Sequence, residues 1–402
     1  MIKDFFIERA SELNNLTWEI HKHIASFPEV GWQEKETTQY LTHFLDEWGV
    51  KYRITKRGVG FIAVLEFKNP DTQTVIYRFD IDQLPVPDEG EKLIISQNKG
   101  VSAACGHSAH TAIGMTVLKI ILENRSMLNG RLVLVAQPAE EIVFDSGMKY
   151  LLEEEDILNY PNIIAAFGLH VTPEYQTGNV HIAEGEFMAS VSELQLTWLG
   201  KSGHVQHQKL TKNTIHAAAE FITQMNIIRS AHSNPFEPLI LSCTKIHSNT
   251  IQSENSNVIP DTTWCTVVYR AFNENFRCEI RDRLISIAKN VAANYDQEVI
   301  PVNFDGIPPV KNDSLLSKWA RTQLNDLLGE THVLECSRRM GGDDIGWLLG
   351  KIPGVYVRLG TGGEQAYEYQ LHDKKFQVNP KALPIGVAAM SYLVYQRLGT
   401  SK

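Results

Sequence analysis

The sequence predicts an α/β protein in which helices flank a central sheet, with a second domain inserted into the first. A strand–loop–helix order recurs over residues 1–170, and a different, alternating pattern begins near Ser190. After the Pro-containing linker at 306–313, helical and strand-like segments of the first kind resume. We therefore predict a first domain in two parts, residues 1–189 and 305–402, and an inserted domain at 190–304.

The first domain is predicted to open with helices and to continue with strands that alternate with helices. Apolar residues recur at helical spacing over residues 1–49, where Pro28 and Gly31 mark a loop. The apolar runs that follow indicate strands, and the longer apolar segments between them indicate helices. We expect strands at 51–55, 60–66, 74–79, 132–135 and 163–169, and helices at 111–122 and 147–155.

The inserted domain is predicted to have the order strand, helix, strand, strand, helix, strand, which is typical of a ferredoxin-like α+β sandwich. Its strands are expected at 191–201, 239–247, 262–272 and 298–304, and its helices at 214–229 and 274–295. The returning part of the first domain is expected to contain a helix at 315–328, a strand at 355–359 and a closing helix at 380–397.

The composition excludes several classes of protein. With 43% hydrophobic and 21% charged residues, the chain is typical of globular proteins, and its formal net charge of -9 argues against a nucleic-acid partner. The five cysteines lack the spacing of a disulfide framework, which indicates a reducing compartment. No apolar stretch approaches the ~20 residues of a membrane span, and the N-terminus lacks a signal-peptide pattern. We therefore expect a cytoplasmic protein with neither a nucleic-acid nor a membrane partner.

The candidate active site centres on Glu140 and Glu141, which follow the apolar run 132–135 and Pro138. Proline cannot continue a central strand, and α/β proteins place their ligands at the open ends of their strands. Two adjacent carboxylates cannot share one environment, so one of them can bind a metal ion while the other transfers a proton. Taken alone, such a pair is more often the solvated start of a helix.

Other predicted loops carry thiol and imidazole groups. Thiolate, imidazole and carboxylate ligands suit Zn²⁺, Mn²⁺ and similar ions. Two ions ~3.5–4 Å apart would need a bridging ligand and about five protein groups, and five remain available when one of the two Glu residues acts as a base. The candidate residues are Cys105, His107, Glu140, Glu141, His170 and His372. We interpret His110, three residues after His107, as an ordinary helix residue.

Nine short segments, in order along almost the whole chain, resemble one branch of the di-metal aminoacylase and glutamate carboxypeptidase metallopeptidase family. They include RFDIDQLPVPDE, ACGHSAHTA, QPAEE, GKSGHVQH and LHDKKF. The branch is that of the N-acyl-amino-acid amidohydrolases. The resemblance implies a mixed central sheet in a di-metal exopeptidase-like catalytic domain, together with an inserted lid and dimerisation domain. It also implies a homodimer through the inserted domain, and hydrolysis of N-acyl amino acids to a carboxylic acid and a free amino acid.

The resemblance implies roles for individual residues as well. Two divalent ions per subunit, Zn²⁺ or Mn²⁺ with Co²⁺ and Ni²⁺ as alternatives, would be bound by Cys105, His107, Glu141, His170 and His372. The catalytic groups would be Glu140 as base and Asp82 as an acidic residue behind the site. His204 would help to hold the substrate carbonyl, and in a dimer it could do so in the active site of the other subunit. Asn257 and Arg270 would contact the substrate carboxylate, although Arg270 is equally typical of a surface strand.

The sequence departs from the family pattern at three places. Ala103 replaces a His before the Cys-Gly-His segment, and Ser108 replaces an Asp directly after it. The later Glu-Asp-Phe segment is Asp343-Asp344-Ile345 here. The partners that orient metal ligands affect metal affinity or activity by about 10–100-fold, so these changes bear on metal occupancy and on the substrate class.

Two alternative functions follow from the same residues. Cys105 could act as a nucleophile with His107 or His170 as its base, because a thiolate hydrolase needs these groups. A family member that had lost its metal would instead bind N-acyl amino acids with little or no cleavage. Chelator treatment and metal analysis discriminate between these cases.

Overall fold

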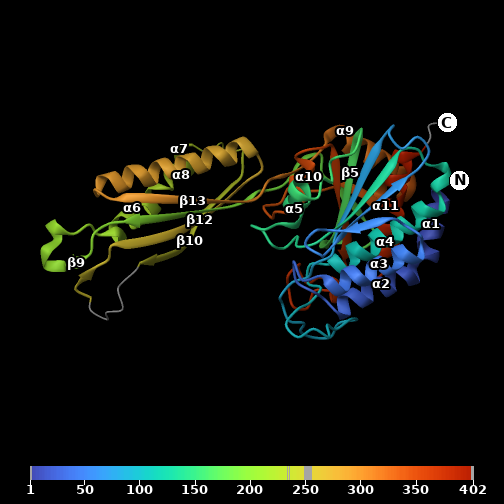
Figure 1. The fold of residues 1–402 in the computed structure, drawn as a ribbon, viewed down its shortest axis with the longest axis horizontal. Helices are drawn as coiled ribbons and strands as arrows, with labels where there is room; N and C mark the ends of the chain where they lie inside the picture. Colours follow the sequence, from blue (N-terminus) through green and yellow to red (C-terminus); the bar gives the residue numbers. More distant parts are fainter. Residues whose placement is uncertain (1, 233, 235, 249–255, 400–402) are drawn as a thin grey trace. The chain divides into compact units, whose positions relative to one another are not determined.

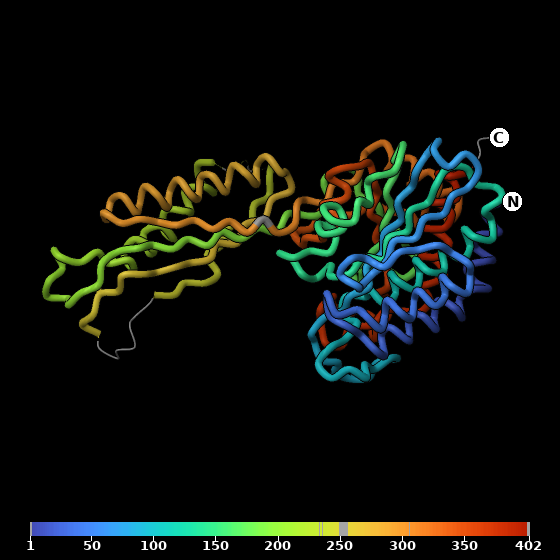
Figure 2. The backbone as a smooth tube through the Cα atoms, viewed as in Figure 1, coloured from blue at the N-terminus to red at the C-terminus, as the bar shows by residue number. Residues whose placement is uncertain are grey.

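The structure is a computed structural model that describes residues 2–232, 234, 236–248 and 256–399. It divides into two compact units, each coloured along the chain in Figures 1 and 2. The first unit comprises Met1–Phe187, Lys311–Arg338 and Asp344–Lys402, and the second comprises Met188–Val310 and Arg339–Asp343.

The first unit is built on an eight-stranded sheet in the order β1-β2-β4-β3-β5-β16-β6-β15. The strands β4, β3, β5 and β16 are mutually parallel, whereas β1 and β2 are antiparallel to their neighbours and β6 is antiparallel to β16. The predicted mixed sheet is therefore confirmed. The strands are β1 (Tyr52–Ile54), β2 (Phe61–Glu66), β3 (Thr74–Asp80), β4 (Arg131–Gln137), β5 (Ile163–Gln176), β6 (Val180–Ile182), β15 (Val333–Glu335) and β16 (Gly354–Gly362).

Helices flank this sheet, as predicted (Figure 1). The most apolar helices, α4 and α11, pack against β3 and β5, and α2 packs on α4. Their buried side chains form one hydrophobic core with the sheet, and every residue of β3, β4 and β16 is buried. The helices are α1 (Ile2–Glu12), α2 (Asn14–Ser26), α3 (Lys35–Glu47), α4 (His107–Glu123), α5 (Gly147–Glu154), α9 (Ser314–Leu328), α10 (Gly346–Leu349) and α11 (Ala382–Leu398).

The second unit has the predicted ferredoxin-like order of elements. Its antiparallel sheet has the order β10-β12-β8-β13, and α6 and α8 pack against the sheet over a separate hydrophobic core. The elements are β8 (Val191–Leu199), α6 (Thr214–Gln224), α7 (Ile227–Ala231), β10 (Leu239–Ser248), β12 (Thr262–Ala271), α8 (Glu274–Asn294) and β13 (Glu298–Ile307). A small sheet is formed by β9 (Gly203–His204) and β11 (Val258–Ile259). Two short strands, β7 (Gly185–Met188) and β14 (Val310–Asn312), lie where the chain passes between the units.

Three sequence-based element predictions are wrong in detail. The helix expected from residue 111 begins at His107, so His107 lies in the first turn of α4 and not before the helix. The strand expected to end at residue 169 continues to Gln176, because β16 pairs with it over this length, and His170 therefore lies within β5. The single helix expected at 214–229 is interrupted between α6 and α7, around Met225 and Asn226.

In the described part of the chain, we find no helix with the length and apolar character needed to cross a membrane.

Candidate active site

The neighbouring parallel strands bring the candidate residues to one edge of the sheet. Asp80 and Gln137, the last residues of β3 and β4, are register partners. Asp82 follows β3 by two residues, and Glu140 and Glu141 follow β4 by three and four. His170 lies on β5, the other neighbour of β3, opposite Arg358 of β16. The site thus lies where parallel α/β sheets place their chemistry.

The turn before α4 requires glycine. Gly106 has a φ of +88°, in the left-handed region, and a Cβ atom there would lie 2.3 Å from Val171. This turn places Cys105 just before the helix and His107 in its first turn, and both side chains are buried.

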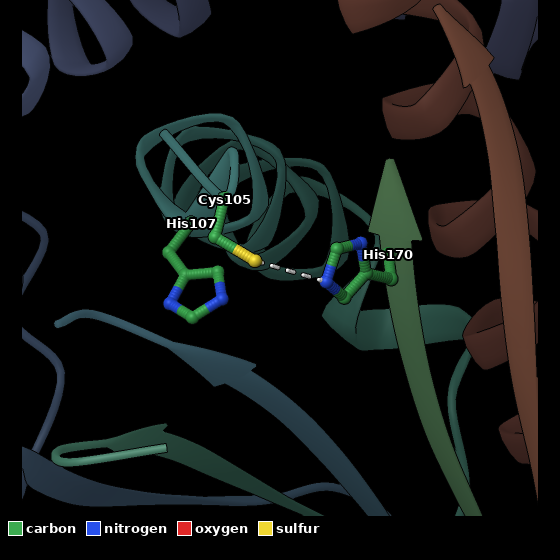
Figure 3. A group of neighbouring side chains, drawn as sticks. All are labelled: Cys105, His107 and His170. Atoms are coloured by element: carbon green, nitrogen blue, oxygen red, sulfur yellow. Dashed lines mark hydrogen bonds between the residues drawn. The ribbon is translucent and has the colours of Figure 1, made fainter. Parts of the chain in front are cut away.

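Cys105, His107 and His170 converge, although His170 comes from a distant strand (Figure 3). One ligand atom from each lies within 4.8 Å of the others. The Sγ atom of Cys105 is 3.6 Å from Nε2 of His170. These three predicted ligands therefore form one group that can hold a metal ion.

The other two predicted ligands form a second group with the same cysteine. Ligand atoms of Cys105, Glu141 and His372 also lie within 4.8 Å of one another. Nε2 of His372 is 3.4 Å from Oε1 of Glu141, and the backbone N–H of His372 donates to Ala104 at 2.7 Å. A third group contains His107, Glu140 and Glu141. Cys105 is common to the first two groups, which is the position expected of a bridging ligand.

His107 and His170 each donate a hydrogen bond from Nδ1, which leaves the Nε2 atoms to bind a metal ion. Nδ1 of His107 donates to the backbone oxygen of Asp82 at 2.9 Å and lies 3.2 Å from its carboxylate. Nδ1 of His170 donates to the Val171 carbonyl at 2.6 Å. Metal-ligating histidines are normally held in this way through their other nitrogen. Among the described residues, Nε2 of His107 and Oε1 of Glu141 are buried without a hydrogen-bond partner, so the site fits a bound cation.

The electrostatics of the site disfavour a cysteine nucleophile. Burial, and then the charges of Glu141 and Glu140, raise the pKa of the Cys105 thiol well above its ordinary value. Burial and the charge of Arg358 lower the pKa of His170 well below its ordinary value. A thiolate–imidazolium pair needs the opposite shifts, whereas a bound cation would deprotonate the thiol.

Burial opposes ionisation of Glu141, yet the net shift is towards the charged form. Burial alone would raise the pKa of this carboxyl, but the adjacent imidazole of His372 and the charge of His107 leave the pKa lowered. Glu141 is therefore ionised at neutral pH, as a metal ligand must be.

Asp82 orients two of the candidate ligands. One carboxylate oxygen lies beside Nδ1 of His107, and the other accepts the backbone N–H of Glu141 at 2.9 Å. The carboxylate partner of His107 is thus Asp82. Position 108, where the family pattern has Asp, is Ser in this chain, and the contact between His107 and Asp82 is nevertheless present.

The sequence analysis missed several buried polar residues behind the site. His110, interpreted as an ordinary helix residue, donates from Nδ1 to Asp80 at 2.7 Å and accepts at Nε2 from the Val171 N–H at 3.0 Å. Arg78 bonds to both Asp80 and Asp344. The one sequence pattern that indicates this network is the pair of charged residues, Arg78 and Asp80, in an otherwise apolar strand. A buried charge needs a partner.

The remaining predicted residues lie in the second unit. Nδ1 of His204 accepts from the Gln206 N–H at 3.2 Å, and the side-chain amide of Asn257 lies 3.1 Å from Nε2. The Asn257 atom at this distance from Nε2 is the amide nitrogen, Nδ2. Arg270 donates to the Met340 carbonyl at 2.9 Å.

Known proteins share this architecture. Residues 76–396 match the profile of peptidase family M20/M25/M40. An N-acetyldiaminopimelate deacetylase of Bacillus cytotoxicus is 29% identical over 385 residues, which cover 94% of this chain and 96% of that protein. The YXEP protein of Bacillus subtilis, described as a dinuclear metal binding peptidase, is 25% identical with a TM-score of 0.81, covering 96% of this chain and 99% of that one. A protein of methicillin-resistant Staphylococcus aureus, thought to be an aminohydrolase, has a TM-score of 0.91 at 24% identity and covers 98% and 99% of the two chains.

Proposed function

Because the chain belongs to peptidase family M20/M25/M40 and is an amidohydrolase, we propose that it uses two divalent ions to remove the acyl group of N-acyl amino acids. The observation that carries this proposal is the pair of ligand groups that share Cys105. Two-metal hydrolases hold their ions close together through a shared ligand.

One Zn²⁺ or Mn²⁺ ion would be held by Cys105, His107 and His170, and the other by Cys105, Glu141 and His372. The donor set of thiolate, imidazole and carboxylate suits both ions. The bound ions would supply Lewis acidity, which polarises an amide carbonyl and eases deprotonation of water.

Glu140 is the proposed base. Its side chain is 7% exposed, one of its oxygens lies 3.8 Å from Nε2 of His107, and Oε1 accepts the N–H of Asp344 at 3.3 Å. The carboxylate takes a proton from the attacking water and returns it to the leaving amine nitrogen. Asp82 keeps His107 and Glu141 oriented while this happens.

His204 is the proposed donor to the oxyanion that develops on the substrate carbonyl. Contacts with Asn257 and with the Gln206 amide hold its imidazole in place, which supports this role. Asn257 and Arg270 stay in the proposal as contacts of the substrate carboxylate. Arg270 is the weaker candidate, because Met340 already occupies one of its donors.

We also propose a homodimer through the second unit. On β13, Ile300, Val302 and Phe304 are 42%, 43% and 38% exposed, whereas Val299 packs against the hydrophobic core of the unit. β10 and β13 are the edge strands of this sheet. An exposed apolar face flanked by edge strands is typical of an association surface. Light scattering of the purified protein should give twice the chain mass.

A substrate panel tests the proposed function. The purified protein would be freed of metal with a chelator, and Mn²⁺, Zn²⁺ or Co²⁺ would then be added back. N-acetyldiaminopimelate, N-acetylmethionine, N-benzoylglycine and a long-chain N-acyl amino acid would be assayed for release of the free amine. We expect no turnover without metal and recovery with it, with the N-acetyl substrates preferred as for the deacetylase relative. Full turnover in the chelator would contradict the proposal and restore the Cys105 nucleophile.

A further inference from the structure

The turn that carries Glu140 and Glu141 has a strained backbone. Ala139 has a φ of +50°, in the left-handed region that residues with a Cβ atom avoid at a cost of roughly 1–2 kcal/mol. Both of its polar backbone groups are held. Its N–H donates to Oε1 of Glu34 at 2.7 Å, and its carbonyl accepts the Gly147 N–H at 2.9 Å. Such conformations persist only where the surroundings impose them.

Glu34 reaches this turn from the loop that precedes α3. The side chain is fully buried, and its loop packs directly on the turn, since a Cβ atom on Gly31 would lie 3.1 Å from Cα of Ala139. Among the described residues, Oε2 of Glu34 has no hydrogen-bond partner. The other oxygen of this carboxyl, Oε1, accepts the Ala139 N–H.

Two carboxyl groups thus accept hydrogen bonds from backbone N–H groups of this turn. Glu34 accepts from Ala139, and Asp82 accepts from Glu141. Burial, and then the charge of Asp82, raise the pKa of Glu34 to about 8. A neutral carboxyl still accepts the amide through its carbonyl oxygen, and it adds no further negative charge beside Asp82 and Glu141.

We propose that Glu34 is a positioning residue of the hydrolytic site, whose carboxyl oxygen fixes the Ala139 peptide and thereby the directions of Glu140 and Glu141. The inference rests on the proposed function, because it is the base and the metal ligand that Glu34 positions. Glu34 touches neither the substrate nor the reacting atoms. What the role requires is an acceptor oxygen at the position of Oε1.

Three substitutions of Glu34 distinguish the effect of its acceptor oxygen from the effects of its side-chain volume and charge. Glu34→Gln keeps both the size and an acceptor oxygen, Glu34→Met keeps the size and removes the acceptor, and Glu34→Asp keeps the carboxyl but withdraws it by one methylene. We expect Glu34→Gln to retain kcat within about twofold. Glu34→Met and Glu34→Asp should lower kcat by roughly 10–100-fold with KM little changed, as for other orienting partners. Glu36→Ala, at an exposed position two residues away, is the control and should match the wild type.

Cation binding provides a readout that does not depend on turnover. Titration with Co²⁺, followed by its visible absorption, should show weaker binding in Glu34→Met, because Glu141 loses its fixed direction. Glu34→Gln should bind Co²⁺ as the wild type does.

Each outcome decides the inference. Wild-type kcat and Co²⁺ binding in Glu34→Met would overturn it, and so would a loss of more than about tenfold in Glu34→Gln. If Glu34→Met fails to fold, Glu34→Asp decides, and wild-type kcat in that variant would overturn the inference. Glu140→Gln is assayed alongside. An inactive Glu140→Gln protein with a fully active Glu34→Met protein refutes the positioning role alone, whereas an active Glu140→Gln protein refutes the proposed base.

Discussion

The guanidinium of Arg78 donates to the carboxylate of Asp344 at 3.0 Å, although 266 positions separate the two residues. Both side chains are fully buried. Asp344 also accepts from Gln137, from the Ser146 hydroxyl and from the Met148 N–H, and its own N–H donates to Glu140. This pair therefore ties the end of β3, the end of β4 and the start of α5 to the proposed base.

Replacing Arg78 with Met should strongly destabilise the first unit. The substitution leaves Asp80 and Asp344 buried without their cation, and breaking a buried pair in this way costs about 3–5 kcal/mol. Urea unfolding measures the loss. Lys318→Ala is the control, because its ion pair with Glu184 is exposed and should contribute less than about 1 kcal/mol. Equal effects of the two substitutions would show that the buried network is not stabilising.

Replacing Cys105 with Ala should remove bound metal. Cys105 belongs to both ligand groups, so its loss should lower the metal content of the purified protein and reduce kcat by at least about 100-fold. Cys336→Ala is a matched control, because both cysteines are 4% exposed. Elemental analysis by mass spectrometry gives the metal content. A Cys105→Ala protein with the full complement of metal would rule out the bridging role.

Replacing Glu140 with Gln should abolish proton transfer and leave the cation site intact. Gln has the same shape but cannot take a proton, so kcat should fall by about 10²–10⁴-fold. The metal content should stay at the wild-type value, since Glu140 is not among the five proposed ligands. Full turnover by a metal-loaded Glu140→Gln protein would exclude Glu140 as the base.

The raised pKa of Glu34 predicts a specific dependence of stability on pH. In the folded protein this carboxyl titrates at about 8, compared with an ordinary value of 4.5. The folded state therefore holds an extra proton between these values, and Glu34 makes the wild type lose stability as the pH rises from about 4.5 to about 8. Glu34→Gln lacks this proton.

The free energy of unfolding of Glu34→Gln, minus that of the wild type, should therefore increase across this window and become constant above about pH 8. Urea unfolding of both proteins between about pH 5 and about pH 9 tests the prediction. A difference that does not change with pH would mean that Glu34 is charged in the folded protein.

Gly106→Ala should destabilise the protein more than Gly100→Ala. Both glycines have positive φ angles, +88° and +83°, so each substitution carries a backbone strain of roughly 1–2 kcal/mol. Only at Gly106 would the new Cβ meet a neighbour, 2.3 Å from Val171, and overpacking typically adds about 1–3 kcal/mol. Thermal unfolding compares the two variants. Equal losses would show that the turn before α4 can move away from β5.

Sequence patterns predicted the elements that are long and buried. The strands β2, β3 and β4 and the helices α8, α9 and α11 were expected within a few residues of their bounds. The strands β6 and β15 were missed, because each has only three residues and too short a pattern to recognise. The start of α4 at His107 was missed because polar residues occupy its buried first turn.

The sequence by itself determined the class of fold, the order of its elements and the chemistry available for a metal site, because periodicity and residue type are local properties of the chain. It also marked Glu140 and Glu141 through their place after a buried strand. Tertiary structure alone decided that Cys105 is common to two ligand groups, that Asp82 partners His107, and that Glu34 holds the Ala139 amide. These contacts join segments brought together by the strand order and register of the sheet, and no local pattern specifies which distant strands become neighbours.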